Sequence, residues 1–473
     1  MLGIAKSGAA ILTAIHRIKA NHGSQTAGVD GKTIRDILDK EPQMVIRTVQ
    51  ATLDDYRPQM VRRVWIPKPG KAEKRPLGIP AIADRVIQEL LRMVMEPILE
   101  AQFFEHSYGF RTDRDAHQAL ERITDICHDT GYHWIVEGDI KGCFDNINHT
   151  KLIKQLWHLG IRDKRVLMIV KQMLKAGIMG EIAVNDLGTP QGGILSPLFA
   201  NAYLHNLDQW ITREWEHKCT KYQYSNQGNK LTALHKSSHL KPAYLIRYAD
   251  DWVLVTATKA QADAWKRRIG KHLGTHLKLT LSEEKTLITD VRKKPIHFLG
   301  HEYRQVRSNK AKRGWKTQTR PDRKRLQAKV AEIRRAEREL RKYSGQNLAY
   351  HIQLINSQIV GVGNFYCDAT LVNPELSRHA DSLKVTAYAA LKRKGATWIP
   401  ACEASNLIER HKSRQTKIPA VEIDRFKLGI TSLDFVSWTK TRLKNQDETK
   451  YSPQGRALHR KRTGKVRRSS GTT

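Results

Sequence analysis

Acidic side chains, cysteines and long apolar runs are all scarce in this chain of 473 residues. Lys and Arg number 82 against 47 Asp and Glu, which leaves a net charge of +35. Such an excess cannot be neutralised on the protein's own surface. It calls for a polyanionic partner, and long nucleic acid is the commonest one. A basic protein that binds anionic membranes is the alternative. Because the basic residues run through the whole chain, we favour nucleic acid.

The cysteines are few and show no pairing pattern. They number five, form no Cys-x-x-Cys pair, and lie at Cys127, Cys143, Cys219, Cys367 and Cys402. This pattern argues against a disulfide framework and a zinc ribbon, and it fits a reducing, cytosolic compartment. Residues 1–20 have no apolar core followed by a cleavage site, so we expect no secretory signal. No run of about 18 uncharged apolar residues occurs, so we expect no membrane span.

The length predicts roughly two to four domains, and the apolar periodicity predicts a mixture of helices and strands. Helices are expected through residues 1–55 and at 84–105, 149–176, 196–216 and 260–274. Strands are expected at 61–67, 133–138, 243–248 and 252–256.

The composition changes near residue 304, where a strongly basic stretch begins, and we place a domain boundary there. Residues 326–342 are predicted to form an amphipathic helix with Leu326, Val330, Ile333 and Leu340 on one face. The tail after about residue 456 is rich in Arg and Lys and has little to bury, so we expect a disordered basic arm.

Two adjacent aspartates, Asp250 and Asp251, lie in the turn between two of the predicted strands. Neighbouring carboxylates repel one another, and a divalent metal is the usual resolution. A third carboxylate, Asp139, ends a separate apolar strand. Apolar strands that end in acid are what a two-metal nucleotidyl-transfer site needs. Taken alone, the pair could equally be an acidic hairpin turn.

Seven stretches resemble the motifs of reverse transcriptases of the group II intron type, and they follow in the same order. They are Ile66–Lys68 with Arg75–Pro80, Ser107–Arg111, Gly138–Ile147, Gly188–Pro197, Tyr248–Asp251, Ser282–Thr286 and Phe298–Gly300. The resemblance covers about residues 25–305 and continues more weakly beyond. The chain is therefore similar to group II intron-encoded reverse transcriptases and maturases. It has no cysteine pairs after residue 370, so we expect it to lack their HNH endonuclease domain.

The resemblance implies an α+β fold of the right-hand polymerase type, with fingers and a palm built on an antiparallel sheet, then a helical thumb and a basic C-terminal region. The implied domains are an N-terminal helical extension at 1–55, fingers and palm at 56–303, a thumb and maturase (X) domain at 304–400, and a DNA- or RNA-binding region with the disordered tail at 401–473.

The resemblance also implies roles for individual residues. Asp139, Asp250 and Asp251 would be catalytic, and with the Ile140 carbonyl they would hold two Mg²⁺ ions. Phe144 takes the family's position for the ring that clashes with a ribose 2′-hydroxyl, which favours dNTPs. The remaining assignments are Lys68, Arg75 and Gln191 for nucleotide binding, and Leu299, Gly300 and His301 for the primer grip. The plainer readings are a core aromatic for Phe144, solvated charges for Lys68 and Arg75, and an ordinary strand end at 299–301.

Residues beyond the polymerase motifs resemble a maturase domain. Asn356–Gly361 followed by Gly363–Tyr366 matches its Gly-aromatic signature, although Val362 stands where the family has Trp. Aromatic and basic side chains on helices can stack on single-stranded bases and hold phosphates. A helical core around Phe365 and Tyr366 would look the same, and both readings can hold together.

We therefore expect an RNA-directed DNA polymerase that binds group II intron RNA, assists its splicing and copies it into cDNA for retrotransposition. Intron RNA, a DNA target or primer and dNTPs would be its partners, in the cytoplasm with the nucleoid or a ribonucleoprotein, and without a membrane. A domesticated reverse transcriptase of phage defence or a CRISPR system stays open. So does a purely RNA-binding splicing factor, although the intact aspartates argue against it. Phe144 argues against an RNA-dependent RNA polymerase. The sequence leaves the oligomeric state open.

Overall fold

The computed structural model describes residues 1–67, 74–176, 187–189, 192–237, 241–445 and 447–469, with only the backbone of Arg75 and of 463–469. The chain forms two compact units. Unit 1 contains Met1–Ile123, Trp134–Ile288 and Lys444–Thr473, and unit 2 contains Thr124–His133 and Thr289–Leu443. None of the described helices is both long enough and apolar enough to cross a membrane.

Unit 1 begins with short helices, as the apolar spacing predicts. They are α1 (Leu2–Ala5), α2 (Gly8–Lys19), α3 (Arg35–Leu38) and α4 (Pro42–Asp54). The α2 helix starts where the Ser7 hydroxyl accepts a hydrogen bond from the amide of Ala10, a typical N-cap. Its buried face includes Ile11, Ile15 and Ile18. Leu12 of the same helix is 45% exposed.

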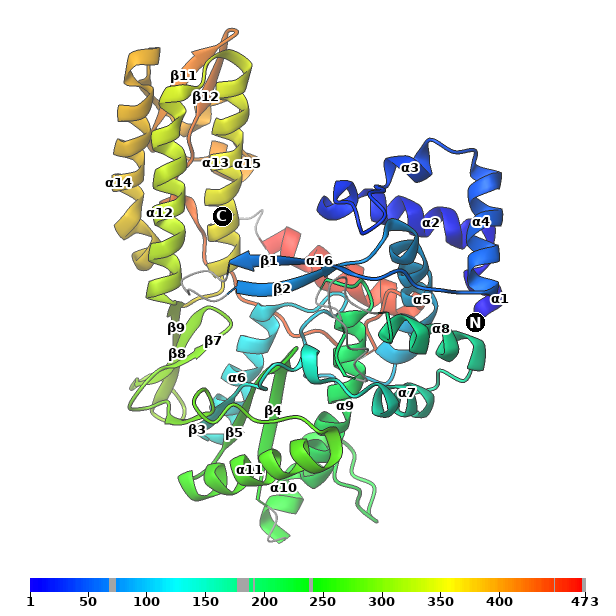
Figure 1. Cartoon of the computed structure of the whole chain (residues 1–473). Helices are drawn as coiled ribbons and strands as arrows, with labels where there is room; N and C mark the ends of the chain where they lie inside the picture. Colours follow the sequence, from blue (N-terminus) through cyan, green and yellow to red (C-terminus); the bar gives the residue numbers. More distant parts are fainter. Residues whose placement is uncertain (68–73, 177–186, 190–191, 238–240, 446, 470–473) are drawn as a thin grey trace. The chain divides into compact units, whose positions relative to one another are not determined.

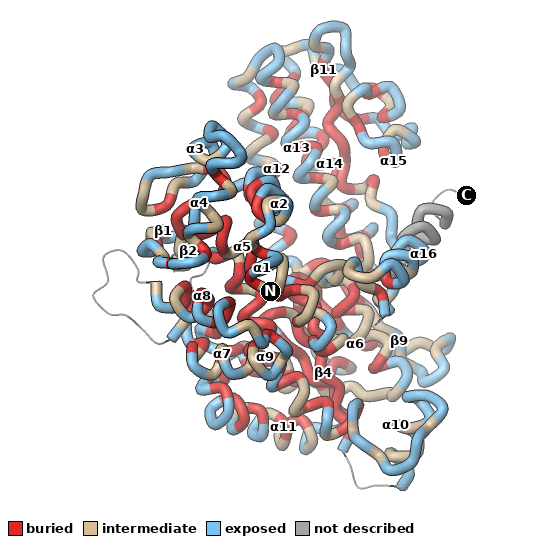
Figure 2. The backbone as a smooth tube through the Cα atoms, turned by 90° about the vertical axis from the view of Figure 1, so that its right-hand side faces the viewer, coloured by how far each residue is buried: buried red, intermediate tan, exposed pale blue. Residues whose placement is uncertain are grey.

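The strands of unit 1 form two antiparallel sheets. The first pairs β1 (Arg62–Pro67) with β2 (Lys74–Ile79). The second has the order β4-β5-β3-β6, and its strands are β3 (Trp134–Gly138), β4 (Ala243–Tyr248), β5 (Asp251–Thr256) and β6 (Leu287–Asp290). The division between the units runs through β6. Both β4 and β5 are buried almost along their length, which explains why their sequences are apolar runs rather than alternating ones (Figure 2).

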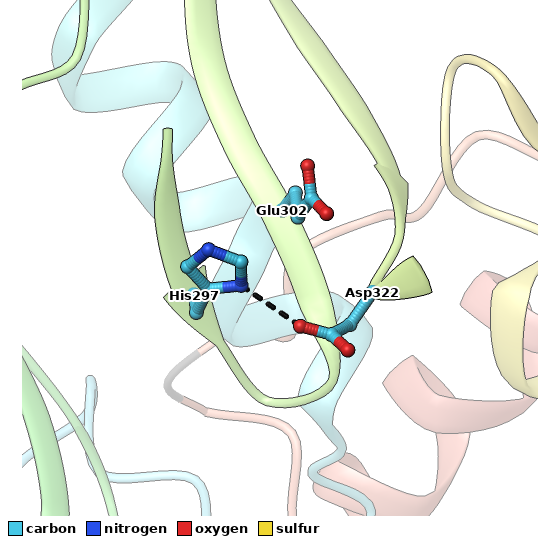
Figure 3. A group of neighbouring side chains, drawn as sticks. All are labelled: His297, Glu302 and Asp322. Atoms are coloured by element: carbon cyan, nitrogen blue, oxygen red, sulfur yellow. Dashed lines mark hydrogen bonds and ion pairs between the residues drawn. The ribbon is translucent and has the colours of Figure 1, made fainter. Parts of the chain in front are cut away.

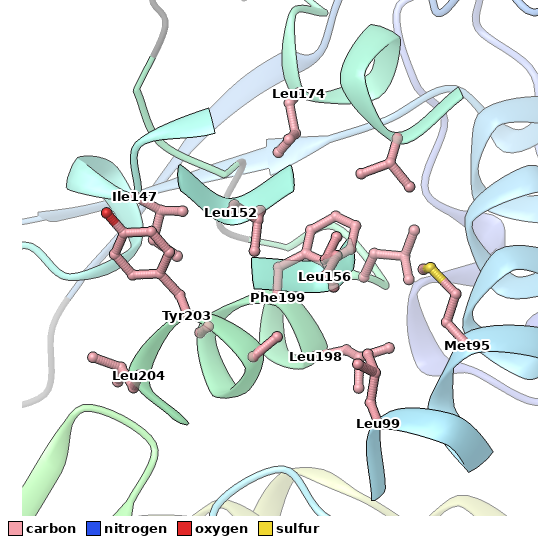
Figure 4. Packing of buried hydrophobic residues seen from close by; sticks show 14 of the residues in the cluster. Met95, Leu99, Ile147, Leu152, Leu156, Leu174, Leu198, Phe199, Tyr203 and Leu204 are labelled. Atoms are coloured by element: carbon pink, nitrogen blue, oxygen red, sulfur yellow. The ribbon is translucent and has the colours of Figure 1, made fainter. Parts of the chain in front are cut away.

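Helices of unit 1 supply most of its core. They are α5 (Ile82–Glu100), α6 (Ala116–Thr130, which enters unit 2), α7 (His149–His158), α8 (Lys164–Leu174), α9 (Ser196–Glu214), α10 (Gln227–Ser237), α11 (Lys259–His272) and α16 (Pro453–Ser469). Met95 and Leu99 of α5 pack with Leu198 and Phe199 of α9 (Figure 4). A fully buried side chain of this size contributes about 1.5–3 kcal/mol.

Unit 2 combines a helical bundle with two small sheets (Figure 1). The bundle consists of α12 (Arg323–Glu339), α13 (Gly345–Tyr366) and α14 (Val372–Leu391). The sheets are β7 (Ile296–Phe298), β8 (His301–Arg307) and β9 (Trp315–Pro321), then β10 (Thr397–Pro400), β11 (Lys417–Ile423) and β12 (Phe426–Gly429), with α15 (Glu409–Lys412) between β10 and β11. Leu326, Val330 and Ile333 are buried on one face of α12, as their spacing predicts.

Three features of the chain's organisation differ from the sequence-based expectation. The region expected as one helix at 149–176 is two, because Asp163 caps a new helix by accepting from the amides of Arg165 and Val166. The compact units divide at 288/289 rather than near 304, since the basic stretch forms the β8–β9 hairpin. The tail is helical as α16 rather than disordered.

The helical tail has a physical cause that composition hides. Glu448, whose side chain is 1% exposed, accepts from Nε of Arg462 at 2.9 Å and pairs with Nδ1 of His459 at 2.7 Å. A buried carboxylate upstream of the helix thus neutralises part of its charge. The charge run alone suggested disorder because the partner lies outside the run.

Candidate active site

The acidic turn connects β4 to β5. Tyr248 pairs with Asp251, which leaves Ala249 and Asp250 as a two-residue loop. Ala249 has a φ of +58°, a value that residues other than glycine seldom adopt. On the other side of β5, Gly138 lies opposite Trp252, so Asp139 leaves β3 next to Asp251. The structure therefore brings the three predicted catalytic aspartates together at one end of the sheet.

A lysine lies among these carboxylates. The ammonium nitrogen of Lys285 is 2.7 Å from the carboxylate of Asp139. The pKa of Lys285 is raised, first by this hydrogen bond and then by the charges of Asp139, Asp251 and Asp250. The three carboxylates thus act together on one cation, which is the property that a metal site requires.

The chain around Asp139 is attached to the segment that carries Lys285. The amide of Ser282 donates to the carbonyl of Asp139 at 2.9 Å, and Ile140 forms an antiparallel bridge with Leu281. Behind this strand end, burial and then the charge of Asp250 raise the pKa of the Cys143 thiol. Cys143 is 2% exposed and stays a neutral thiol, so it contributes packing rather than a ligand.

A buried guanidinium supports the acidic turn from within the protein. Arg247 of β4 donates to both carboxylate oxygens of Asp208 at 2.7 and 2.6 Å and to the Ala249 carbonyl at 2.8 Å. It also donates at 3.0 Å to Oδ1 of Asn201, whose side-chain amide donates at 2.8 Å to the carbonyl of Gly109. Helix α9 thereby holds the turn on one side and the loop at Gly109 on the other.

These supporting residues escaped the sequence analysis. Asn201 and Asp208 are polar residues two turns apart on one face of a helix that is otherwise largely apolar, and both are buried. This stripe is the signal that could have located them, because buried polar groups on a core helix require partners.

Phe144 is half-buried and contacts three parts of unit 1. One side of it packs against the main core of unit 1. Its ring also meets that of Phe110 edge to face, with centroids 6.3 Å apart. Its carbonyl accepts from the amide of Thr189 at 2.8 Å, which attaches it to the Gly188–Pro197 stretch.

The other predicted nucleotide-binding residues are only partly described. Lys68 and Gln191 lie outside the described residues, and Arg75 is described by its backbone, opposite Ile66 in the β1–β2 hairpin. Gly192 approaches this hairpin so closely that a Cβ atom would lie 2.7 Å from the carbonyl oxygen of Gly78. Two of the motif stretches therefore meet at this point, and only glycine fits there.

The predicted primer grip is the turn of the β7–β8 hairpin in unit 2. Leu299 and Gly300 both have positive φ, at +50° and +80°, and form the two-residue loop. His301 is fully buried, with ring centroids 5.6 Å from Phe365 and 5.1 Å from Tyr366. The aromatic residues of the maturase-like signature thus pack on this turn. These two rings enclose the His301 imidazole.

A second group of metal-ligating side chains, His297, Glu302 and Asp322, flanks this turn (Figure 3). Nδ1 of His297 pairs with Asp322 at 2.8 Å, and Asp322 also caps α12 by accepting from the amide of Arg325. Glu302 accepts from Nε of Arg320 at 2.7 Å. Since each group already has a protein partner, the cluster connects β7 and β8 to α12 and needs no ion to explain it.

The chain is similar to several known proteins. A family profile described as "Reverse transcriptase (RNA-dependent DNA polymerase)" matches residues 66–303, half of the chain. The "Group II intron-encoded protein LtrA" of Lactococcus lactis subsp. cremoris is 36% identical over 348 residues, which cover 65% of this chain and 57% of that protein. "Protein YkfC" of Escherichia coli (strain K12) is 36% identical over 304 residues, covering 61% of this chain and 78% of that one.

A third relative is the "Uncharacterized 91 kDa protein in cob intron" of Schizosaccharomyces pombe. It is 33% identical over 329 residues, which cover 61% of this chain and 39% of that protein. The chain thus spans between two-fifths and four-fifths of the length of these relatives, and just over half of LtrA.

Proposed function

Because the chain belongs to the reverse transcriptase (RNA-dependent DNA polymerase) family, we propose that it copies RNA into DNA as a protein of the group II intron type. It binds intron RNA, assists the splicing of that RNA, and copies it into cDNA for retrotransposition. Its substrates are dNTPs, and a DNA target supplies the primer. Similarity to a protein named as group II intron-encoded supports the intron assignment.

The observation that carries the proposal is the meeting of three carboxylates at the ends of β3, β4 and β5. Reverse transcriptases generally use divalent metal ions, and carboxylate and carbonyl oxygens are the donors that Mg²⁺ prefers. The capture of the Lys285 ammonium supports the fit of a cation here. Asp139, Asp250, Asp251 and the Ile140 carbonyl would hold two Mg²⁺ ions. Such ions activate a primer 3′-hydroxyl and stabilise the triphosphate and its leaving group.

The other assigned residues orient the reactants. Lys68 and Arg75 would hold the triphosphate by charge-assisted hydrogen bonds, and Gln191 would line the nucleotide. Phe144 would exclude a 2′-hydroxyl by its size, which selects dNTPs. The turn at Leu299 and Gly300 would hold the primer through its backbone.

Primer extension with an Asp250→Asn variant tests the polymerase. The change keeps the size of the side chain and removes the charge. Mutating a residue that only hydrogen-bonds to a metal ligand typically lowers activity by about 10–100-fold. Asp250 would be a ligand itself, so we expect the rate of primer extension to fall by more than about 100-fold. RNA affinity should stay nearly unchanged, because phosphate contacts dominate it. Asp54→Asn is the matched control, since Asp54 is an exposed acid that pairs with Lys6 in the N-terminal helices. Unreduced extension by Asp250→Asn would contradict the proposal.

The maturase part has a separate test. Splicing of the cognate intron at near-physiological Mg²⁺ should be faster with the protein, and Asp250→Asn should support it equally, because splicing needs RNA binding rather than polymerisation. Sequencing the RNA that co-purifies with the protein identifies that intron.

A domesticated reverse transcriptase without an intron is the second candidate. This candidate would be preferred if the flanking DNA encodes no intron RNA secondary structure and the protein still extends primers.

A further inference from the structure

Phe110 is held in an uncommon way for a phenylalanine. Its φ is +59°, in the left-handed region that bulky side chains avoid. Its surface is 56% exposed, so burial does not compensate for this conformation. Such backbone strain persists only where the surroundings fix it, and it concentrates at functional sites.

The residues on both sides of Phe110 are fixed by the protein. Gly109 lies so close to the acidic turn that a Cβ atom would meet the amide nitrogen of Ala249 at 2.4 Å. On the other side, Arg111 is 6% exposed and donates to the carboxylate of Glu100 at 2.9 Å. The contacts of Gly109 and Arg111 therefore fix the backbone at Phe110 relative to the acidic turn. They also hold its ring in an exposed position.

The ring of Phe110 contacts the ring of Phe144. The two rings meet edge to face, with centroids 6.3 Å apart and an interplanar angle of 81°. Phe144 also packs against the main core of unit 1, whereas Phe110 lies outside that core. Edge-to-face pairs are favourable beyond the area they bury, so Phe110 limits the positions that the ring of Phe144 can take.

We propose that Phe110 is a positioning residue for sugar discrimination, which holds the ring of Phe144 where it excludes a ribose 2′-hydroxyl. The inference rests on the proposed function, since it requires Phe144 to face the sugar of the incoming nucleotide. Phe110 acts through Phe144 and does not touch the nucleotide itself. Because Gly109 packs on Ala249, the ring also keeps a constant relation to the catalytic carboxylates.

The test is primer extension with a dNTP and the matching rNTP, with kcat/KM determined for each. Phe110→Ala should lower the preference for the dNTP by about two- to tenfold, the range that the loss of one aromatic pair gives. Phe144→Ala should lower it further. Adding Phe110→Ala to Phe144→Ala should change nothing more, because the effect passes through the ring that is already absent. Phe110→Tyr keeps the ring edge and should restore the wild-type preference.

Tyr222→Ala is the matched control. Tyr222 is 69% exposed, lies in unit 1 and meets Tyr224 edge to face at 4.8 Å, so it reports the general effect of losing such a ring. It should leave the preference unchanged.

Each other result has a distinct meaning. Wild-type protein that makes no DNA overturns the proposed function and this inference with it. An unchanged preference in Phe144→Ala overturns the sugar gate and the role of Phe110. If Phe144→Ala lowers the preference for the dNTP and Phe110→Ala leaves it unchanged, only the role of Phe110 is overturned. A further drop in the double variant shows Phe110 acting independently and also overturns it.

Discussion

Arg247 and Asp208 form a buried two-bond ion pair directly behind the acidic turn. Their side chains are 1% and 0% exposed, and Nη2 of Arg247 lies 2.6 Å from the carboxylate. The same guanidinium holds the carbonyl of Ala249 at 2.8 Å, next to Asp250 in the turn. Charges this deep in a protein are tolerated only as a pair, so helix α9 and the acidic turn must keep a fixed relation.

The first prediction concerns this pair. Asp208→Ala leaves a buried guanidinium without its partner, and we expect the free energy of unfolding of unit 1 to fall by about 3–5 kcal/mol. Urea denaturation followed by tryptophan fluorescence measures it, because Trp252 is buried beside the site. As a control, Arg57→Ala breaks an ion pair whose partners are 84% and 71% exposed, and should cost less than about 1 kcal/mol. Equal stability of the two variants would contradict the prediction.

The second prediction concerns metal affinity. The ammonium of Lys285 competes with any cation for Asp139, because the two lie 2.7 Å apart. Lys285→Ala should therefore bind Mn²⁺ more tightly than the wild type in the absence of nucleotide, by a few-fold for a partly exposed charge at this distance. Titration calorimetry measures the affinity. Lys266→Ala is the control, since Lys266 pairs instead with the exposed Glu283. Weaker binding by Lys285→Ala would mean that the ammonium supports the metal rather than opposing it.

The third prediction concerns the pH dependence of stability. Glu337 of α12 is fully buried in unit 2, and among the described residues its carboxylate has no hydrogen-bond partner. Burial raises its pKa to about 8 from an ordinary value of 4.5. The unfolded chain therefore loses this proton at lower pH than the folded protein does. It follows that stability falls as the pH rises from about 4.5 to about 8.

Glu337→Gln should remove this loss. We expect no gain in the free energy of unfolding near pH 4.5, and a gain of up to about 5 kcal/mol above pH 8. Thermal unfolding across that pH range measures it. Glu332→Gln changes a 56% exposed residue of the same helix and should show no such trend. A gain that is the same at every pH would show that the carboxyl titrates normally.

The fourth prediction concerns RNA binding. With a net charge of +35, affinity should come largely from released counterions. Raising the salt from 50 to 200 mM should weaken binding by roughly 10³-fold if about six or more phosphates are contacted. Fluorescence anisotropy with a labelled single strand measures the slope. A flat profile would contradict the role given to the basic charge.

The meeting of the three aspartates could be predicted from the sequence because strand ends are local features. Asp139 ends an apolar run and Asp250 sits between two, so a sheet that pairs those strands had to bring the carboxylates together. The motif order supplied the family for the same reason. These are properties of single segments, and they need no knowledge of distant contacts.

The support of the site could not be read in the same way. Arg247, Asp208 and Asn201 come from separate segments, and each looks like an ordinary surface residue until the fold buries it. Nothing local indicates that Phe365 and Tyr366 enclose His301, because those rings come from a distant segment of the chain. The helix α16 was missed because its stabilising partner, Glu448, precedes it in the chain.

Unit 1 is not contiguous in the chain, since Lys444–Thr473 rejoin it after unit 2. Lys444 and Lys450 both donate to Thr112, close to the loop that carries Phe110. Synthesis runs at about 5–20 residues per second, so the last residue of unit 2 is added roughly a second or less before Lys450. A nascent chain that stalls after Leu443 would carry a finished bundle and an incomplete unit 1.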